Sequence, residues 1–129
     1  YFFAKENAME IQTVEKNEIT IALVRSDELL ITDVQSALDL IATVNYETGS
    51  HRIVLDKGLV SEDFFKLSTR LAGDILQKFI NYRTKVAIVG DYSGYTSKPL
   101  KDFIYESNHG KDVFFVSSEE EAVERLTSV

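Results

Sequence analysis

A polar segment between a buried strand and a helix is where this sequence could do chemistry. The apolar run that ends at Val89 is followed by Gly90 and then by residues with carboxylate, phenol, hydroxyl and amine groups: Asp91, Tyr92, Ser93, Tyr95, Thr96, Ser97 and Lys98. Side chains of these types can cradle a phosphate, supply a nucleophile or contact a partner. The first two interpretations require a characteristic spacing, which the sequence can be checked against.

A phosphate loop requires the spacing G-x-x-x-x-G-K-[ST], because its glycines let backbone amides wrap the phosphate. Counted from Gly90, the second glycine position is occupied by Tyr95 and the lysine position by Thr96. Lys98 follows Ser97 without the required glycine. We therefore do not expect a phosphate loop, although a weaker anion site near Ser97 and Lys98, at the start of the next helix, stays open.

A hydrolase elbow requires G-x-S-x-G, and here Ser93 stands one place late between Gly90 and Gly94. Asp102 and His109 complete the order of a catalytic triad only superficially. They lie on one short predicted helix, about 10 Å apart at 1.5 Å per residue, which is too far for a direct hydrogen bond. We expect no catalytic residue here, and no carboxylate–histidine spacing indicates a metal site. No cofactor is expected.

Composition excludes several classes of partner. The chain has 129 residues, of which 44% are hydrophobic, so a core can form in one domain without cross-links. There is no cysteine, and the formal net charge is −7. Nucleic-acid binding rests on Lys and Arg neutralising phosphates, so this acidic balance argues against it and against an anionic membrane surface. No apolar stretch is long enough for a membrane span and no cationic leader is present, so we expect a cytoplasmic location.

The first eight residues differ in character from the rest of the chain. Tyr1–Ala8 resembles a tag remnant, with a native N-terminal extension as the alternative, and Met9 is a plausible native start. We expect a single domain over residues 9–129.

The first half of the chain predicts a hairpin, a helix and a buried strand. Apolar residues alternate over Met9–Val14 and Ile19–Val24 around a polar turn, which is typical of a β-hairpin. Helical spacing follows from about Asp33 to about Tyr46, with Gly49 beyond its end. Arg52–Asp56 is a short buried strand.

The second half predicts alternating helices and strands. Ser61 should cap a long helix that reaches Ile80 and carries two apolar stripes. A buried strand over residues 85–89, a short helix around residues 100–107 and a strand over residues 113–116 come next. Ser118 and Glu121 form a capping box for a final helix. The order β-β-α-β-α-β-α-β-α predicts an α/β fold with one mainly parallel sheet and an antiparallel hairpin at its N-terminus.

Ligands of open α/β sheets bind outside the carboxyl ends of the strands. Two segments qualify by position: Asp56-Lys57-Gly58 after the third strand, and residues 91–98 after the fourth. Asp56 and Lys57 of the first segment, together with Arg83, are predicted as neighbours of the polar loop in a ligand- or partner-binding site.

A long block carries a family likeness. NYRTKVAIVGDYSGYTSKPLKDFIYESNHG, residues 81–110, resembles the hallmark block of a bacterial family known only as domain of unknown function 4180. The upstream LAGDILQKFINYR, the downstream DVFFVSSEEEAVERL and the opening EITIALVRSDELLITDVQSALDLIA also resemble that family. The resemblance covers essentially Met9 to Leu126, and it implies no particular reaction.

The element order, the AIVGD strand end and the FFVSSEEEAVERL finish also resemble SpoIIAA-like, or STAS, domains. These are small α/β regulators that dock on partners. In typical members a phosphorylatable serine follows an aspartate at the start of the helix after the third strand. Here Asp63 aligns with that aspartate and Phe64 occupies the serine position, so the resemblance implies that the usual phosphorylation switch is missing.

Three functions stay open at this point. We favour a bacterial, non-enzymatic STAS-like regulatory module that binds a protein or a small ligand. The alternative is a small-ligand-binding protein or an enzyme that uses the crevice at the carboxyl ends of the strands; a perturbed Asp91 would favour it, and an Asp91 that merely caps a turn would count against it. The third is a homodimer built on the long helix.

Overall fold

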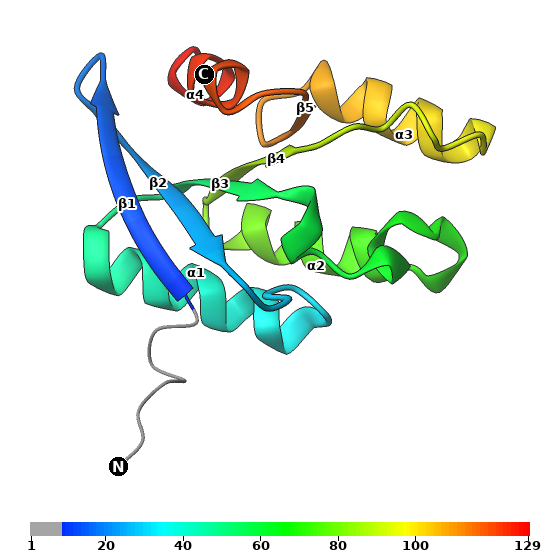
Figure 1. The fold of residues 1–129 in the computed structure, drawn as a ribbon, viewed down its shortest axis with the longest axis horizontal. Helices are drawn as coiled ribbons and strands as arrows, with labels where there is room; N and C mark the ends of the chain where they lie inside the picture. The colour runs from blue at the N-terminus through cyan, green and yellow to red at the C-terminus, as the bar shows by residue number, and fades with distance from the viewer. Residues whose placement is uncertain (1–8) are drawn as a thin grey trace.

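The structure is a computed structural model that describes residues 9–129; the predicted tag remnant, Tyr1–Ala8, lies outside the described residues. Five strands form one sheet in the order β1-β2-β3-β4-β5 (Figure 1). Their bounds are β1 Met9–Lys16, β2 Ile19–Ser26, β3 Arg52–Asp56, β4 Lys85–Val89 and β5 Val113–Val116. β1 and β2 pair antiparallel and all the other neighbours pair parallel. The predicted fold class, element order and N-terminal hairpin are confirmed.

A two-residue turn sets the register of the hairpin. Asn17 and Glu18 both have positive φ, 55° and 66°. This is the type I′ geometry whose twist matches that of paired strands. Lys16 therefore lies opposite Ile19, and the register runs on to Met9 opposite Ser26.

Four α-helices cover the sheet: α1 Val34–Thr48, α2 Leu71–Asn81, α3 Lys98–Asn108 and α4 Glu119–Thr127. In Figure 1, α1 and α2 lie on one side of the sheet and α4 on the other, while α3 lies along β5. Within residues 9–129, no helix is long and apolar enough to cross a membrane.

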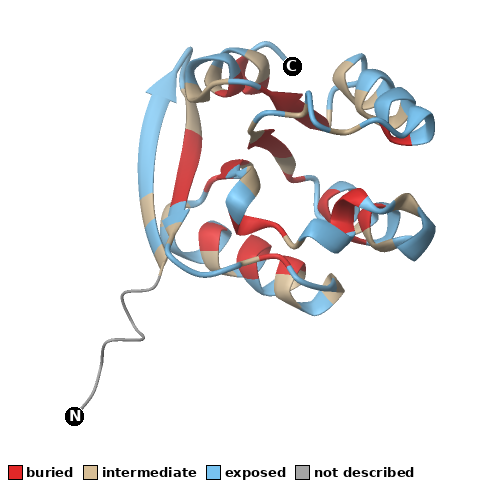
Figure 2. Cartoon of the chain, turned by 45° about the vertical axis from the view of Figure 1, so that its right-hand side comes forward, coloured by how far each residue is buried: buried red, intermediate tan, exposed pale blue. Residues whose placement is uncertain are grey.

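The central strands consist mainly of buried residues, which are red in Figure 2. Alternate residues of each strand enter two separate cores. In β3, Ile53 and Leu55 join the larger core with α1 and α2, and Val54 joins the smaller core under α4. Continuous apolar runs at β3, β4 and β5 follow from this double coverage.

The predicted long helix from Ser61 to Ile80 is wrong. The segment folds as short 3₁₀ turns over Lys57–Leu59, Glu62–Phe65 and Leu67–Thr69, and α2 begins only at Leu71. Ser61 caps the Glu62–Phe65 turn, where its hydroxyl accepts a hydrogen bond from the amide of Asp63 at 3.3 Å.

Local chemistry explains the interruption. Arg70 has a φ of 64°, in the left-handed region that a continuing helix cannot use. The hydroxyl of Thr69 donates to the carbonyl of Lys66 at 2.8 Å and accepts from the amide of Leu71 at 3.1 Å, so it replaces helical backbone bonds. The consecutive rings of Phe64 and Phe65 are both buried, which the irregular turn permits.

Helix ends agree with the sequence elsewhere, with one exception. Asp33 caps α1, and Gly49 ends it with a φ of 73°. Ser118 caps α4 by accepting from the amide of Glu121 at 3.1 Å. The Glu121 carboxylate, however, accepts from the amide of Ser117 at 3.1 Å, so only half of the predicted capping box is present.

The outer edge of β5 is closed by a side chain. The Asn108 amide oxygen accepts from the Phe115 amide at 2.7 Å, and the Asn108 amide nitrogen donates to the Phe115 carbonyl at 3.1 Å. The Arg125 guanidinium donates a hydrogen bond to the Asn108 backbone carbonyl and so helps to fix the position of Asn108. Asn108 thus occupies the outward amide and carbonyl of Phe115, two of the groups that a sixth strand would use.

Candidate functional site

The segments that follow β3 and β4 are in direct contact. The aliphatic stem of Lys57 crosses the backbone at Gly90 so closely that a Cβ atom at Gly90 would lie 2.6 Å from the Cβ of Lys57. No side chain fits in that space. The sequence prediction that Lys57 neighbours the loop after β4 agrees with this geometry.

Three polar side chains meet above this crossing. The Tyr95 hydroxyl donates to Oε2 of Glu62 at 2.5 Å. Nζ of Lys57 donates to Oε1 of the same carboxylate at 3.3 Å. Glu62 therefore joins the loop after β4 to the segment after β3, and we call Lys57, Glu62 and Tyr95 the polar triad.

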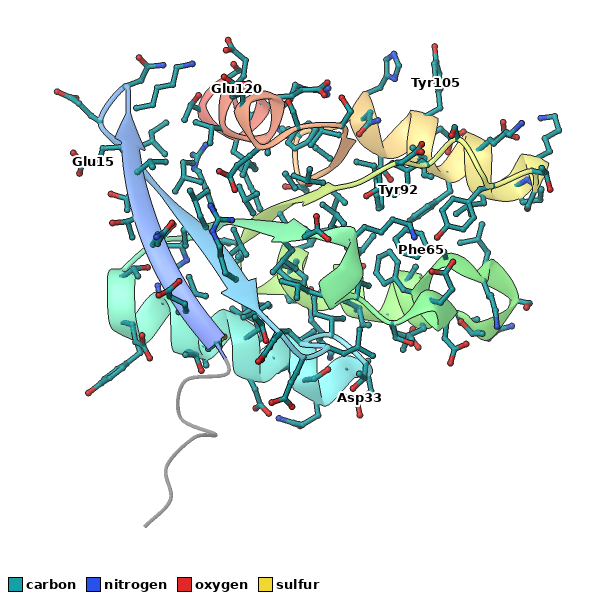
Figure 3. The ribbon with its side chains drawn as sticks, in the orientation of Figure 1. Glu15, Asp33, Phe65, Tyr92, Tyr105 and Glu120 are labelled. Carbon is teal, nitrogen blue, oxygen red and sulfur yellow. The ribbon has the colours of Figure 1, made fainter. Side chains whose placement is uncertain are left out.

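Packed aromatic rings support the triad from below. The Tyr95 ring stacks on Phe65 at a centroid distance of 5.3 Å, and Tyr92 lies 5.9 Å from Phe65 and 5.6 Å from Phe115. Figure 3 shows the side chains of Phe65 and Tyr92 pointing into the same space between β4 and the segment that precedes α2. We call Phe65, Tyr92, Tyr95 and Phe115 the aromatic platform.

The cation of the triad also lies on this platform. Nζ of Lys57 is 5.1 Å from the ring centroid of Phe65 and 5.0 Å from that of Tyr95. Both distances are within the range of a cation–π interaction. The ammonium is thus fixed by one carboxylate and two rings.

The triad shifts the pKa values of its members. The hydrogen bond from Tyr95, with help from Lys57, lowers the pKa of Glu62. Burial and the Glu62 carboxylate raise the pKa of Tyr95. Burial opposes the charged form of Lys57, but its neighbours Tyr95 and Glu62 outweigh burial and raise the pKa of Lys57. The resting state is a charged Lys57, a charged Glu62 and a neutral Tyr95.

Tyr92 is the most enclosed phenol of the loop. Its hydroxyl donates to the carbonyl of Ile88 at 2.8 Å, and burial raises its pKa well above the ordinary range. A phenol with its proton held in this way anchors the loop to β4 and is a poor acid.

Three of the predicted site residues cap turns or a helix. Asp56 accepts from the Gly58 amide at 2.8 Å, and Asp91 accepts from the Ser93 amide at 2.9 Å. Ser97 accepts from the Leu100 amide at 3.4 Å and begins α3. Hydrogen bonding from the Ser93 hydroxyl and amide lowers the pKa of Asp91, so this carboxylate stays ionised.

Other predicted residues lie at the rim or farther away. Ser93 and Thr96 are exposed, and Lys98 forms an exposed ion pair with Asp102 at 2.7 Å. Arg83 lies before β4, whereas the polar loop follows β4. The structure therefore separates Arg83 from the predicted site by the length of the strand, because the two flank opposite ends of it.

A shallow crevice adjoins the platform. It has a volume of about 470 Å³ and lies over the carboxyl ends of β4 and β5, with Asp91, Tyr92, Phe115 and Glu121 among its lining residues. No group of three or more histidine, cysteine or carboxylate residues that could hold a metal ion occurs in the described part of the chain.

Two other hollows lie away from this end. A groove of about 480 Å³ between α1 and the amino ends of β3 and β4 contains His51, whose Nε2 is 3.0 Å from the Asn45 amide nitrogen. A third, of about 250 Å³, lies between α2 and α3 and is lined by Leu76, Ile80 and Phe103. The groove at the amino ends is as large as the crevice, but the triad and the platform lie only at the carboxyl ends.

Sequence reasoning missed Glu62, Phe65 and Phe115. Glu62 and Phe65 lie in the segment that was predicted to be one long helix with two apolar stripes. The signal that could have indicated Glu62 and Phe65 is their position in the sequence, a few residues after the strand-ending Asp56.

These observations define a mixed α/β domain with a rigid aromatic and charged surface at the carboxyl ends of its strands. Residues 16–126 match the model of the family described as domain of unknown function 4180, and the chain belongs to that family. The resemblance found in the sequence is confirmed.

Two further comparisons place the chain among known proteins. No curated protein sequence matches it. Among solved structures, it is similar to a Thermotoga maritima protein described as a candidate anti-sigma factor antagonist, with 15% identity, 91% of this chain and 94% of that chain covered, and a TM-score of 0.44. This is a distant likeness.

Proposed function

We propose that this protein is a non-enzymatic regulatory module that binds a protein partner through the carboxyl ends of β3 and β4. The polar triad on the aromatic platform is the observation that carries the proposal. Tyrosine side chains held over a packed base are common anchors of protein interfaces. Groups that are already fixed by internal bonds lose little conformational freedom on binding.

The polar groups of the site already have hydrogen-bond partners within the chain, which supports binding rather than catalysis. Asp56, Asp91 and Ser97 are used as caps, and Glu62 is held by both Lys57 and Tyr95. A nucleophile or general base needs a group within hydrogen-bond reach of its substrate and poised to exchange a proton. An ionised Asp91 that closes a turn is the outcome that counts against an enzyme.

The second candidate is a small-ligand site in the adjoining crevice of about 470 Å³. Its walls combine the rings of Tyr92 and Phe115 with the carboxylates of Asp91 and Glu121. Native mass spectrometry of the purified protein, beside its denatured mass, tests this candidate. Extra mass that disappears on denaturation would favour a ligand site over a docking surface.

A partner-capture experiment tests the docking surface with matched variants. Lys57→Met keeps the aliphatic stem over Gly90 and removes the charge, and Lys98→Ala removes a rim charge that is 84% exposed. Arg83→Ala is the control at the other end of β4. We expect the partner captured by the wild type to bind Lys57→Met at least about tenfold more weakly, since hot spots are worth about 2 kcal/mol or more.

Melting temperatures separate binding from folding. Ser97→Ala removes the cap of α3 and should itself cost about 1 kcal/mol of stability, so Lys98→Ala is the cleaner test at the rim. Unchanged capture by Lys57→Met and Lys98→Ala, with normal melting, would show that the triad is structural and would end the proposal.

A further inference from the structure

The two edges of the sheet differ in their protection. Asn108 closes the edge at β5. β1 forms the other edge and is eight residues long, and in the described part of the chain it pairs only with β2. Figure 1 shows β1 along the outside of the molecule, and its residues from Gln12 to Lys16 are exposed.

The turn determines which backbone groups of β1 point outward. In a hairpin with a two-residue turn, the residues that flank the turn form a hydrogen-bonded pair, here Lys16 with Ile19. Such pairs alternate along the strand, so Val14, Gln12 and Glu10 also bond to β2. The amides and carbonyls of Glu15, Thr13, Ile11 and Met9 therefore face away from the sheet, and no residue among 9–129 pairs with this row, which a further strand can use.

We propose that β1 pairs antiparallel with β1 of a second copy of this chain, with Thr13 opposite Thr13. Two-fold symmetry requires a self-complementary strand. In this register Glu10 of each copy lies opposite Lys16 of the other, so two cross-strand pairs of opposite charge form. About six backbone hydrogen bonds join the copies through the outward groups of residues 11, 13 and 15.

The charges select this register from its neighbours. The register of the two β1 strands can shift only by an even number of residues, because other shifts would place outward-facing backbone groups opposite groups that already bond to β2. With Thr13 opposite Ile11, Glu10 lies opposite Val14 and the charge pairs are lost. With Ile11 opposite Ile11 the overlap within β1 shortens to residues 9–13. The Thr13-centred register alone combines a long overlap with paired charges.

The charged residues already have neighbours within one copy. Glu10 lies opposite Arg25 in the hairpin, and Lys16 forms an ion pair with Glu124 of α4 at 3.1 Å. Glu10 and Lys16 lie on the α4 face of the sheet, where the second copy would bring its Lys16 to Glu10 and its Glu10 to Lys16.

Sedimentation equilibrium of the full chain tests the proposal directly. We expect the wild type to shift from monomer to dimer as its concentration rises. Thr13→Pro removes an outward amide and leaves the bonds between β1 and β2, so the dimer should be lost with an unchanged circular dichroism spectrum. Thr13→Val keeps the amide and should dimerise like the wild type. A monomeric wild type at millimolar concentration, or a dimer that survives Thr13→Pro, would overturn the proposal.

Charge-reversal variants of Glu10 and Lys16 distinguish pairing between two copies of this chain from pairing with another protein. Glu10→Lys alone and Lys16→Glu alone should each raise the dimer dissociation constant several-fold, because like charges then face each other across the strands. The double variant restores opposite charges and should recover most of the loss. Failure of the double variant to recover would show that the register is wrong, and a strand from a different protein would then be the better occupant.

Discussion

The carboxyl and amino ends of β3 and β4 offer similar polar residues but support them differently. At the carboxyl end, Lys57, Glu62 and Tyr95 bond to one another over packed rings. At the amino end, His51 contacts Asn45, and Tyr82, which lines the same groove, is 57% exposed as a residue. The hollows at the two ends are similar in volume, so their size does not distinguish them. The two ends differ in the packing of the aromatic rings beneath the polar groups.

The largest expected effect comes from removing the base of the platform. Phe65→Ala deletes a ring that is 4% exposed and contacts Tyr92, Tyr95 and Phe115. We expect a loss of about 3–5 kcal/mol in the free energy of unfolding, because a large cavity remains. Tyr82→Ala, at the amino end, should change it by no more than about 0.5 kcal/mol. Urea denaturation measures both, and similar losses would remove the difference between the two ends.

A smaller effect comes from the crossing at Gly90. Gly90→Ala forces a methyl group to within 2.6 Å of the Lys57 stem and should cost about 1–3 kcal/mol as the loops move apart. The control is Gly73→Ala in α2, where nothing lies within 4 Å of the new methyl group. That variant should gain about 0.5–1 kcal/mol from helix propensity. A thermal melt that ranks the two variants the other way would contradict the close approach of Lys57.

The smallest effect concerns the Tyr95 hydroxyl. Tyr95→Phe should cost about 0.5–1 kcal/mol near neutral pH, since it removes one hydrogen bond to Glu62. The variant should also raise the pKa of Glu62 toward its ordinary value of 4.5, because the Tyr95 bond is the main cause of the lowering. A titration of the Glu62 carboxyl carbon by NMR measures this shift.

The pH dependence of the same pair has a definite sign. The folded pKa of Glu62 is lowered, so its contribution to stability is present above 4.5 and is lost as the pH falls through the folded value. The folded pKa of Tyr95 is raised, so its contribution is present below 10.0 and is lost as the pH rises through the folded value. The stability difference between wild type and Tyr95→Phe should therefore be largest between these limits. A difference that is constant from acid to alkali would contradict the bond.

The sequence predicted those elements whose signals are local. Short continuous apolar runs predicted the bounds of β3, β4 and β5, and the caps Asp33, Gly49 and Ser118 placed helix ends within a few residues. The stretch from Ser61 to Ile80 was misjudged because its apolar spacing fits a helix as well as it fits a broken segment. Only the left-handed Arg70 and the burial of both Phe64 and Phe65 decide between them, and these depend on tertiary packing.

The site was predictable in position and not in detail. The rule that parallel strands end at a common edge brought Lys57 to the loop that contains Tyr95. Glu62 and Phe65 reach Lys57 and Tyr95 because their segment forms 3₁₀ turns where a helix was predicted. The wrong prediction of a helix therefore concealed two residues of the site. Arg83 was predicted as a neighbour of the loop, but β4 lies between them.

Asn108 also limits how far copies of this chain can assemble. A sheet with two open edges can add copies at both sides and grow into a fibre, whereas a sheet with one open edge is exhausted by a single two-fold contact. Because the Asn108 amide already fills the hydrogen-bonding positions at Phe115, in the middle of the short strand β5, a third copy that paired there would have to displace it. If the copies pair through β1 as proposed, this side chain at the end of α3 therefore favours a closed dimer over a growing polymer.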